Sequence, residues 1–324
     1  MEENTEQRLD LTLFSEKIQE LKERIASVVV GQEQTVDLVL TAVLANGHVL
    51  IEGVPGVAKT LLARLTARLI DADFSRIQFT PDLMPSDVLG TTVFNMKTNG
   101  FDFHQGPIFA DIVLVDEINR APAKTQAALF EVMEERQVSI DGTTHRMGGL
   151  YTILATQNPV EQEGTYKLPE AQLDRFLMKI TMDYPSLEEE VNILERHHTN
   201  AALVKLEDVT PVLTKEELLS LRALMSRVFV DRTLLQYIAL IVQQTRTSKA
   251  VYLGASPRAS VAMLQSSKAY ALLQGRDFVT PEDIKFVAPY VLQHRLILTA
   301  EAEMEGYSPV KVTQRLIDKV EVPK

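Results

Sequence analysis

Residues 47–60 read GHVLIEGVPGVAKT, an apolar stretch followed by a glycine-containing turn that ends in Lys59 and Thr60. This pattern is typical of a phosphate-binding loop, in which backbone N–H groups surround the phosphates, the lysine reaches the β and γ oxygens, and the threonine hydroxyl binds Mg²⁺. The general form GxxxxGK[ST] has glycine where this chain has Ala58. An ordinary strand-to-helix turn therefore stays an alternative until other parts of a nucleotide site are found. The residues predicted to contact the nucleotide here are Gly53, Val54, Pro55, Gly56, Val57, Ala58, Lys59, Thr60 and Leu61.

The composition indicates a globular protein with room for two domains, because 324 residues are 45% hydrophobic and 24% charged. The absence of cysteine excludes a disulfide framework and a thiolate metal site. The acidic start of the chain is unlike a signal peptide, and no apolar run approaches the ~18 residues that cross a bilayer. We therefore expect a cytoplasmic protein without membrane insertion. With 44 acidic and 33 basic side chains, the net charge of −11 disfavours a broad nucleic-acid surface.

The first part of the chain alternates apolar strands with helical patterns, which predicts an α/β core with a parallel five-stranded sheet. The strands are expected at residues 48–52, 76–79, 112–116, 151–156 and 176–182. Two hairpins are expected within this core, at residues 91–103 around Thr98-Asn99-Gly100 and at residues 137–147 around Asp141-Gly142.

The pattern becomes helical after Tyr184-Pro185. Capping boxes begin at Ser186 and Thr214, Thr280 precedes a proline at a helix start, and we expect no strand in this part. The sequence thus predicts a nucleotide-binding core over residues 1–184 and an all-α lid domain over residues 185–324.

Two carboxylates follow the predicted strand at 112–116. In a parallel sheet the carboxyl ends of the strands open onto one crevice, so Asp116 and Glu117 are expected beside the phosphate loop. Asp116 would then hold Mg²⁺, and Glu117 would orient and polarise the water that attacks the γ-phosphate. The alternative is a buried strand that ends in two solvated acids.

Three further polar residues extend this prediction. Asn158 ends the next buried strand and could bond both the attacking water and the γ-phosphate, although it could also be a turn residue before Pro159. Arg175 precedes the fifth strand on the side away from the loop, so it could reach the nucleotide of a neighbouring subunit. An ion pair with Asp174 or another acid is the alternative. Arg258 starts a helix capped by Ser256, where the helix dipole disfavours a cation and an anionic partner is expected.

In their order and spacing these elements resemble the AAA+ ATPases, and more closely the MoxR subfamily. Four sequence motifs carry the resemblance: GVPGVAKT at 53–60, VDEINRA at 115–121, ATQNP at 155–159 and LPEAQLDRF at 168–176. In that subfamily alanine before the loop lysine is usual, so Ala58 supports the resemblance.

The resemblance implies a role for each matching position. Lys59 and Thr60 match Walker A, Asp116 and Glu117 match Walker B, Asn158 matches sensor 1, Arg175 the arginine finger and Arg258 sensor 2. Gly31 and Gln32 match the segment against the adenine, and Arg120 is expected near a subunit boundary. Residues 91–103 look like the helix-2 insert, and residues 137–147 like the hairpin before sensor 1. Together these imply hydrolysis of ATP with Mg²⁺ by Glu117, Asn158, Arg175 and Lys59.

The resemblance also implies partners. Members of the subfamily are similar in forming homo-hexamers and in acting as chaperone-like remodellers on a protein client, often with a partner that carries a von Willebrand factor A domain. Three alternatives stay open: a motor subunit of a metal chelatase, a helicase-related ATPase stimulated by nucleic acid, and a nucleotide-gated binding module without turnover.

Overall fold

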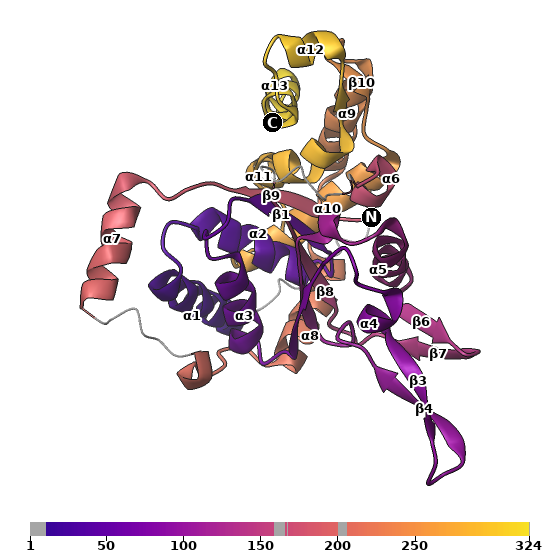
Figure 1. The fold of residues 1–324 in the computed structure, drawn as a ribbon. Helices are drawn as coiled ribbons and strands as arrows, with labels where there is room; N and C mark the ends of the chain where they lie inside the picture. The colour runs from indigo at the N-terminus through magenta and orange to yellow at the C-terminus, as the bar shows by residue number, and fades with distance from the viewer. Residues whose placement is uncertain (1–10, 159–165, 167, 200–205, 324) are drawn as a thin grey trace, which may run out of the picture.

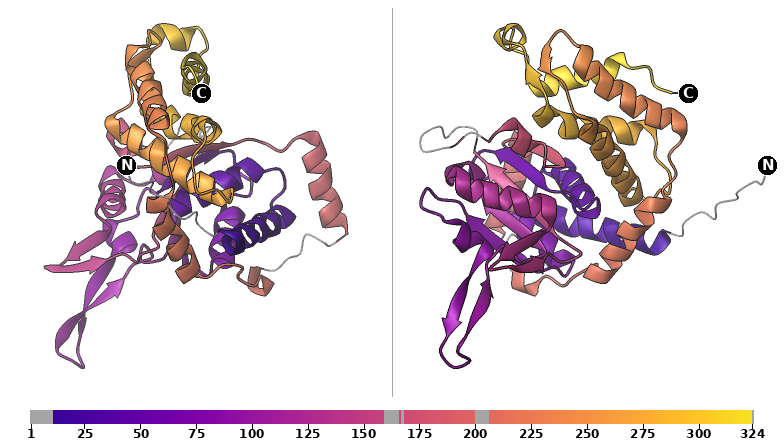
Figure 2. Two further views of the ribbon diagram at one scale, coloured as in Figure 1. Left: turned by 180° about the vertical axis from the view of Figure 1, so that it is seen from behind. Right: turned by 90° about the vertical axis from the view of Figure 1, so that its right-hand side faces the viewer.

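The computed structural model describes residues 11–158, 166, 168–199 and 206–323. In it an α/β core carries a helical domain at one end, and a long hairpin projects from the opposite end (Figures 1 and 2). Residues 1–10 of the predicted core, Pro159 of the ATQNP motif and Lys324 lie outside the described residues. None of the predicted site residues is among them.

The central sheet has five parallel strands, as the sequence predicts, and their order is β2-β5-β8-β1-β9. The strands are β1 (Val49–Gly53), β2 (Phe74–Gln78), β5 (Ile112–Asp116), β8 (Thr152–Gln157) and β9 (Met178–Met182). Each begins and ends within about two residues of its predicted bounds. Because β1 lies between β8 and β9, the loop after β1 opens where the strand order reverses, which is where ligands bind in such sheets.

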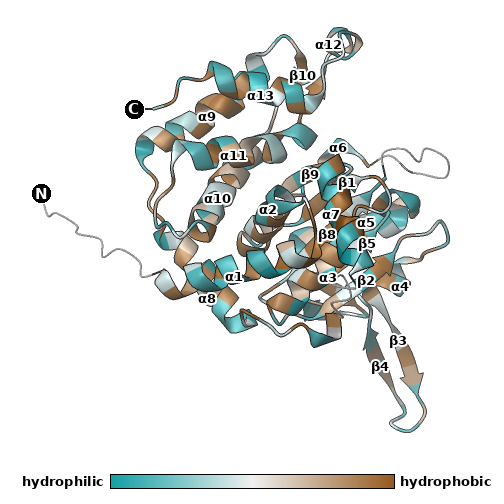
Figure 3. Cartoon of the chain, turned by 90° about the vertical axis from the view of Figure 1, so that its left-hand side faces the viewer, coloured by the Kyte–Doolittle hydropathy of each residue, from teal (hydrophilic) through white to brown (hydrophobic). Residues whose placement is uncertain are grey.

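Helices cover both faces of the sheet, so successive residues of a strand enter two different cores. In β5, Ile112 and Leu114 pack into the larger core, while Val113 and Val115 pack into the smaller one. Helices α1 (Thr12–Val28), α2 (Glu33–Leu44) and α3 (Lys59–Leu69) belong to the larger core, and α5 (Ala123–Glu135) belongs to the smaller one. Figure 3 shows the hydrophobic strands at the centre between these helices.

Both predicted hairpins are present and extend from the same side of the core (Figure 1). The longer one follows α4 (Pro85–Leu89) and consists of β3 (Gly90–Asn95) and β4 (Gly100–Gln105). The shorter one consists of β6 (Gln137–Ile140) and β7 (Thr143–Arg146). Its turn has positive φ at Asp141 and Gly142, which is the backbone that a two-residue hairpin requires.

Helix α6 (Glu170–Leu173) lies between β8 and β9, while helices α7 (Leu187–His198) and α8 (Lys215–Leu224) connect the sheet with the lid. Short 3₁₀ turns follow β5 (η1, Ile118–Arg120), precede α8 (η2, Leu206–Asp208) and follow α8 (η3, Met225–Arg227). The predicted capping boxes at Ser186 and Thr214 are confirmed, since each side chain accepts a hydrogen bond from the third helical residue. Helix α8 packs back on the core, where Lys215 pairs with Asp111 at 2.5 Å.

The lid domain consists of α9 (Arg232–Thr247), α10 (Pro257–Leu273), α11 (Pro281–Leu292), α12 (Ala300–Met304) and α13 (Pro309–Lys319), with η4 (Gln293–Arg295) after α11. The prediction of a helical lid is confirmed, but the expectation that no strand follows residue 185 was wrong. Strands β10 (Val251–Leu253) and β11 (Ile297–Leu298) form an antiparallel ribbon. They are three and two residues long, too short for an alternating pattern to be seen in the sequence.

The lid is fixed to the edge strand of the sheet. Gln293 donates to the carbonyl of Lys179 at 2.5 Å, His294 contacts the carbonyl of Phe176 at 3.0 Å, and α10 packs on α2. The larger hydrophobic core therefore continues from the α/β core into the lid. Within the described part of the chain, every helix is too short or too polar to cross a membrane.

Candidate functional site

The loop predicted to bind phosphate joins β1 to α3. Gly56 has φ +90° and faces open space, and Ala58 has φ +61°, a left-handed conformation that costs an alanine more than a glycine. Gly53 lies so close to β9 that a Cβ there would be 2.7 Å from the carbonyl oxygen of Met182. Lys59 folds back over the loop and donates to the carbonyl of Gly53 at 2.6 Å. Because α3 begins at Lys59, an anion in the loop meets a helix N-terminus.

Asp116 ends β5 at the same edge of the sheet. It is buried, and its two oxygens have different partners. Oδ2 accepts from Nε of Arg76 at 2.6 Å, and Oδ1 accepts from the hydroxyl of Thr156 at 3.1 Å. A carboxylate and the Thr60 hydroxyl are oxygen donors of the kind that Mg²⁺ prefers, so these two side chains fit the predicted ion.

Glu117 follows in a left-handed conformation, with φ +56°. Its backbone N–H donates to the hydroxyl of Thr156 at 3.0 Å, so Thr156 links the two acidic residues. Its carboxylate accepts from Nε2 of Gln78 at 2.7 Å and lies 3.1 Å from Nε of Arg120. Arg120 thus contacts the glutamate of its own chain in this structure.

Asn158 and the segment around Gly31 complete this side of the molecule. Asn158 follows β8, the strand between β5 and β1, and is buried. Gly31, with φ +72°, lies in the turn between α1 and α2, and Gln32 accepts from the hydroxyl of Thr35 at 2.9 Å. The structure therefore brings the phosphate loop, Asp116, Glu117 and Asn158 to the carboxyl edge of one sheet.

Sequence reasoning missed Arg76, Gln78 and Thr156. The first two lie two residues apart on β2, so their side chains are on one face of the sheet, and Gln78 is in register with Asp116. A polar pair in a short strand is visible in the sequence. Its meaning depends on β2 lying beside β5, which the sequence does not state.

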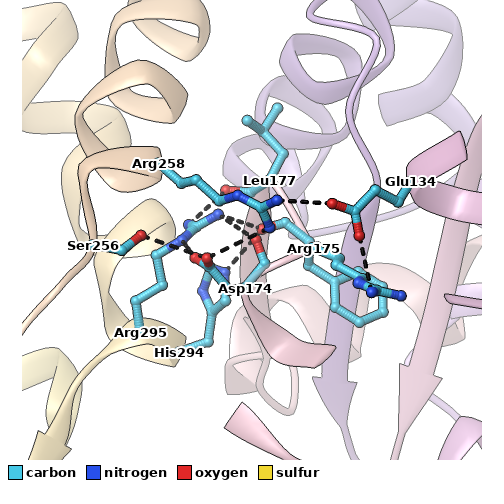
Figure 4. A network of polar contacts seen from close by, with 9 residues as sticks. Glu134, Asp174, Arg175, Leu177, Ser256, Arg258, His294 and Arg295 are labelled. Atoms are coloured by element: carbon cyan, nitrogen blue, oxygen red, sulfur yellow. Dashed lines mark hydrogen bonds and ion pairs between the residues drawn. The ribbon is translucent and has the colours of Figure 1, made fainter. Parts of the chain in front are cut away.

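Arg175 and Arg258 lie elsewhere, at the amino edge of the sheet (Figure 4). Both guanidinium groups pair with Glu134 at the end of α5, Arg175 at 2.9 Å and Arg258 at 2.7 Å. Arg258 is also 4.0 Å from Asp174. The alternative of an ion pair with a nearby acid is thus realised for Arg175, with Glu134 as the acid. The anionic partner expected for Arg258 is also Glu134, and the structure does not bring Arg258 to the phosphate loop of its own chain.

Comparison with known families matches the α/β core and the helical lid to two separate family models. The family described as "ATPase family associated with various cellular activities (AAA)" matches residues 48–178, and the AAA lid domain matches residues 243–318. The first range contains all the residues at the carboxyl edge from Gly53 to Asn158, and Arg175. Arg258 lies in the second range.

Individual relatives narrow the family. The chain is 45% identical to Chaperone MoxR1 of Mycobacterium tuberculosis over 93% of this chain and 81% of that protein. It is 31% identical to Protein MoxR of Methylorubrum extorquens over 91% of each. The chain belongs to the MoxR family of AAA+ ATPases. A crystal structure of a candidate ATPase from Cytophaga hutchinsonii superposes on this MoxR-family fold with a TM-score of 0.88, at 41% identity and 97% coverage of both chains.

In this MoxR-family protein a buried lid residue, Arg295, holds the two residues on either side of Arg175. Arg295 donates to the carboxylate of Asp174 at 2.7 Å and to the carbonyl of Phe176 at 2.7 Å (Figure 4). Burial lowers the pKa of Arg295 from its ordinary value, and the Asp174 carboxylate opposes that shift. Ser256 takes the N-cap position as predicted, but its hydroxyl lies 3.5 Å from Asp174 and does not cap its helix. The lid therefore holds the segment that carries Arg175.

His48 lies at the amino end of β1 and is buried. Its Nδ1 accepts from the N–H of Ile153 at 3.0 Å, so the ring proton is on Nε2, which donates to the carbonyl of Met133 at 3.1 Å. Burial, together with the nearby Arg136, lowers the pKa of His48 to about 3. The amino edge of the sheet thus contains a neutral histidine, because both of its ring nitrogens already have backbone partners and burial disfavours the charged form.

Proposed function

We propose that this MoxR-family protein is a Mg²⁺-dependent ATPase whose active site is completed by a second copy of the chain. One observation carries the proposal: the phosphate loop and the acidic residues lie at the carboxyl edge of the sheet, whereas Arg175 and Arg258 lie together at the amino edge. The five-residue β1 separates the two edges by about 16 Å at ~3.3 Å per residue. Neither arginine therefore reaches a nucleotide bound at the loop of its own chain without a large rearrangement.

The residues at the carboxyl edge supply the chemistry of hydrolysis. Lys59 would exchange the carbonyl of Gly53 for the phosphates, and Thr60 and Asp116 would hold the metal ion. When bound, Mg²⁺ would neutralise the charge that develops on the transferred phosphoryl group. Glu117 orients and polarises the attacking water, and Asn158 bonds the water and the γ-phosphate. Gly31 and Gln32 lie against the adenine.

The amino edge supplies positive charge to the neighbour. Arg175 acts on the neighbouring γ-phosphate as an arginine finger, and Arg258 joins it from the lid, in trans. Such a head-to-tail contact is heterologous and closes into a ring when its rotation permits. We propose a homo-hexamer, by resemblance to the family.

The biological role follows from the family in the same way. A relative that is named a chaperone supports a chaperone-like remodeller, and we propose a von Willebrand factor A domain protein as its partner on a protein client. Movement of the lid against the core would reach the client through the β3–β4 and β6–β7 hairpins, which project from one side.

Complementation of two inactive variants tests the shared site. Arg175→Ala removes the finger and keeps the carboxyl edge, whereas Glu117→Gln removes the water-orienting group and keeps the finger. When the two proteins are mixed, we expect phosphate release to recover, because a Glu117-containing site receives Arg175 from the other variant. No recovery in mixtures shown by size exclusion to form joint assemblies contradicts a site shared between copies.

A control separates binding from turnover. Lys59→Ala is expected to abolish ATP binding, so it should not restore the Glu117→Gln protein through its own loop. Phosphate release that depends on Glu117 would exclude a binding module without turnover. Affinity isolation with Glu117→Gln protein, which should retain ATP, identifies the partner.

A further inference from the structure

Helix α7 lies apart from the core (Figure 1), and its apolar side chains Leu187, Val191 and Leu194 are exposed. Its polar side chains contact its own chain: Arg196 donates to the carbonyl of Ser27 at 2.5 Å, and a Cβ at Gly31 would lie 2.4 Å from the carboxylate of Glu189. Leu187, Val191 and Leu194 are 81%, 46% and 65% exposed. No residue of α7 is buried.

The three exposed residues form one stripe. Positions i, i+4 and i+7 lie on one side of a helix, and Glu189 and Arg196 lie on the opposite side. A 12-residue helix is marginal in water without packing of an apolar face. Among the described residues of its own chain, nothing covers the stripe on α7, and a second surface would stabilise it.

The position of α7 limits what that surface is. Glu189 lies against Gly31, in the segment expected beside the adenine, so α7 flanks the nucleotide site of its own chain. A copy that brings Arg175 and Arg258 to this site also brings the surface around those arginines close to α7.

That surface contains a hollow of about 480 Å³. Its apolar part includes Leu177, Val261 and Ala262, and Val261 is 55% exposed one turn beyond Arg258 on α10. Its charged part is basic. The lining includes four arginines and one carboxylate, that of Asp174, and Glu134 beside the hollow pairs with two of the arginines. The four arginines are Arg136, Arg175, Arg258 and Arg295.

We propose that the apolar stripe of α7 packs into this hollow of the neighbouring copy. The charges are complementary. Three exposed glutamates of α7 (Glu188, Glu190 and Glu195) meet a hollow whose four arginines outnumber the two carboxylates that pair with three of them, those of Asp174 and Glu134. Arg175 and Arg258 then face the phosphates, while Val261 and Ala262 receive Leu187, Val191 and Leu194. This inference rests on the proposed head-to-tail assembly and names the second contact that holds it together.

Disulfide cross-linking tests the contact directly, because the natural chain has no cysteine. Leu194→Cys protein and Val261→Cys protein, one carrying a size tag, are mixed with ATP and oxidised. We expect a mixed dimer on non-reducing gels. Asn192→Cys, on another side of the same helix, is the matched control and should give at least about tenfold less mixed product. Equal yields from the two α7 positions overturn the proposal.

A second variant tests the contact without cross-linking. Replacing Leu187, Val191 and Leu194 together by glutamine keeps good helix formers and removes the apolar stripe. Dilute protein should bind a fluorescent ATP analogue as before, while the protein concentration for half-maximal ATPase activity should rise at least about tenfold. An unchanged concentration dependence overturns the contact. If Arg175→Ala and Glu117→Gln proteins still complement each other in that case, the shared active site stands and only the α7 contact fails.

Discussion

The two edges of the central sheet hold their charged groups in different ways. At the carboxyl edge, Asp116 and Glu117 are bonded by Arg76, Gln78 and Thr156, which all come from neighbouring strands of one sheet. At the amino edge, one arginine from the core and one from the lid converge on a single carboxylate, Glu134.

This difference shows what each edge depends on. The carboxyl edge is fixed by the pairing of adjacent strands, so its geometry is set once the sheet forms. The amino edge depends on how the lid sits on the core, and Arg295 maintains that position through Asp174. Movement of the lid therefore changes the arginine side of the proposed site and leaves the phosphate loop unchanged.

Removal of Arg175 should have the largest effect and should distinguish the role of the amino edge in turnover from the role of the carboxyl edge in ATP binding. We expect Arg175→Ala to lower kcat by about 10³ to 10⁵, the range seen when an arginine finger is lost, because transition-state charge is no longer neutralised. ATP binding should change little, because the loop lies at the other edge. Phosphate release and equilibrium ATP titration on the same preparation measure both. A large loss of ATP affinity would place Arg175 at the loop of its own chain and break the comparison.

Removal of the carboxylate at the carboxyl edge should have the next largest effect. Glu117→Gln is expected to lower kcat by about 10² to 10⁴, as for loss of a group that activates water. The amide keeps the shape of the side chain and its contact with Gln78, so bound ATP should persist. Single-turnover kinetics check this, and Asn192→Gln on exposed α7 is a control for surface substitution. Wild-type turnover by Glu117→Gln would assign the water to another residue.

His48 offers a test of the amino edge through stability. Its pKa is about 3 in the folded chain and 6.5 in the unfolded one, so below pH 6.5 the unfolded state binds more protons. The free energy of unfolding should fall by about 1.6 kcal/mol from this residue between pH 6.5 and 5, because the slope rises from half of 1.36 kcal/mol per pH unit at pH 6.5 to nearly the full value at pH 5. Urea titrations of wild type and His48→Gln at both pH values give the difference. A pH dependence that is the same in both proteins contradicts the buried neutral ring.

The sequence predicts the carboxyl edge well for a physical reason. Apolar runs locate the strands. Asp116 is the last residue of one strand, Asn158 directly follows another, and Lys59 ends the loop after a third, so their convergence needs only a parallel sheet. To predict that Arg76 and Gln78 contact the two acidic residues, one also needs the strand order, which places β2 beside β5. Each predicted strand is therefore correct to about two residues, while the hydrogen-bond partners of the acids were not foreseen.

The amino edge is less accessible to sequence reasoning. Arg258 pairs with Glu134, 124 positions away, across the boundary between lid and core. The helix start at Ser256 indicates that an anion is needed, but no local pattern identifies which one. The ribbon of β10 and β11 was missed for a related reason, because two very short strands pair across more than forty residues and Leu298 packs against α12 and α13.

Substitution of Glu134 should give the smallest effect, and it tests most directly whether the amino edge is less preorganised than the carboxyl edge. Both of its ion pairs are partly exposed, and such pairs contribute about 0 to 1 kcal/mol. In a single chain Glu134 competes with a neighbouring phosphate for Arg175 and Arg258. Glu134→Gln should therefore lower the protein concentration for half-maximal ATPase activity by up to about fivefold, the ratio that 1 kcal/mol gives.

The matched control is Glu135→Gln, next to Glu134 on α5. Among the described residues Glu135 forms no ion pair with either arginine, so this variant should leave the concentration dependence as in the wild type. ATP affinity of dilute protein should be the same in both variants, because α5 ends at the amino edge. An increase in the required concentration for Glu134→Gln alone would mean that the carboxylate positions the arginines for the neighbour. In that case Glu134 belongs to the assembled site, and the amino edge is as preorganised as the carboxyl edge.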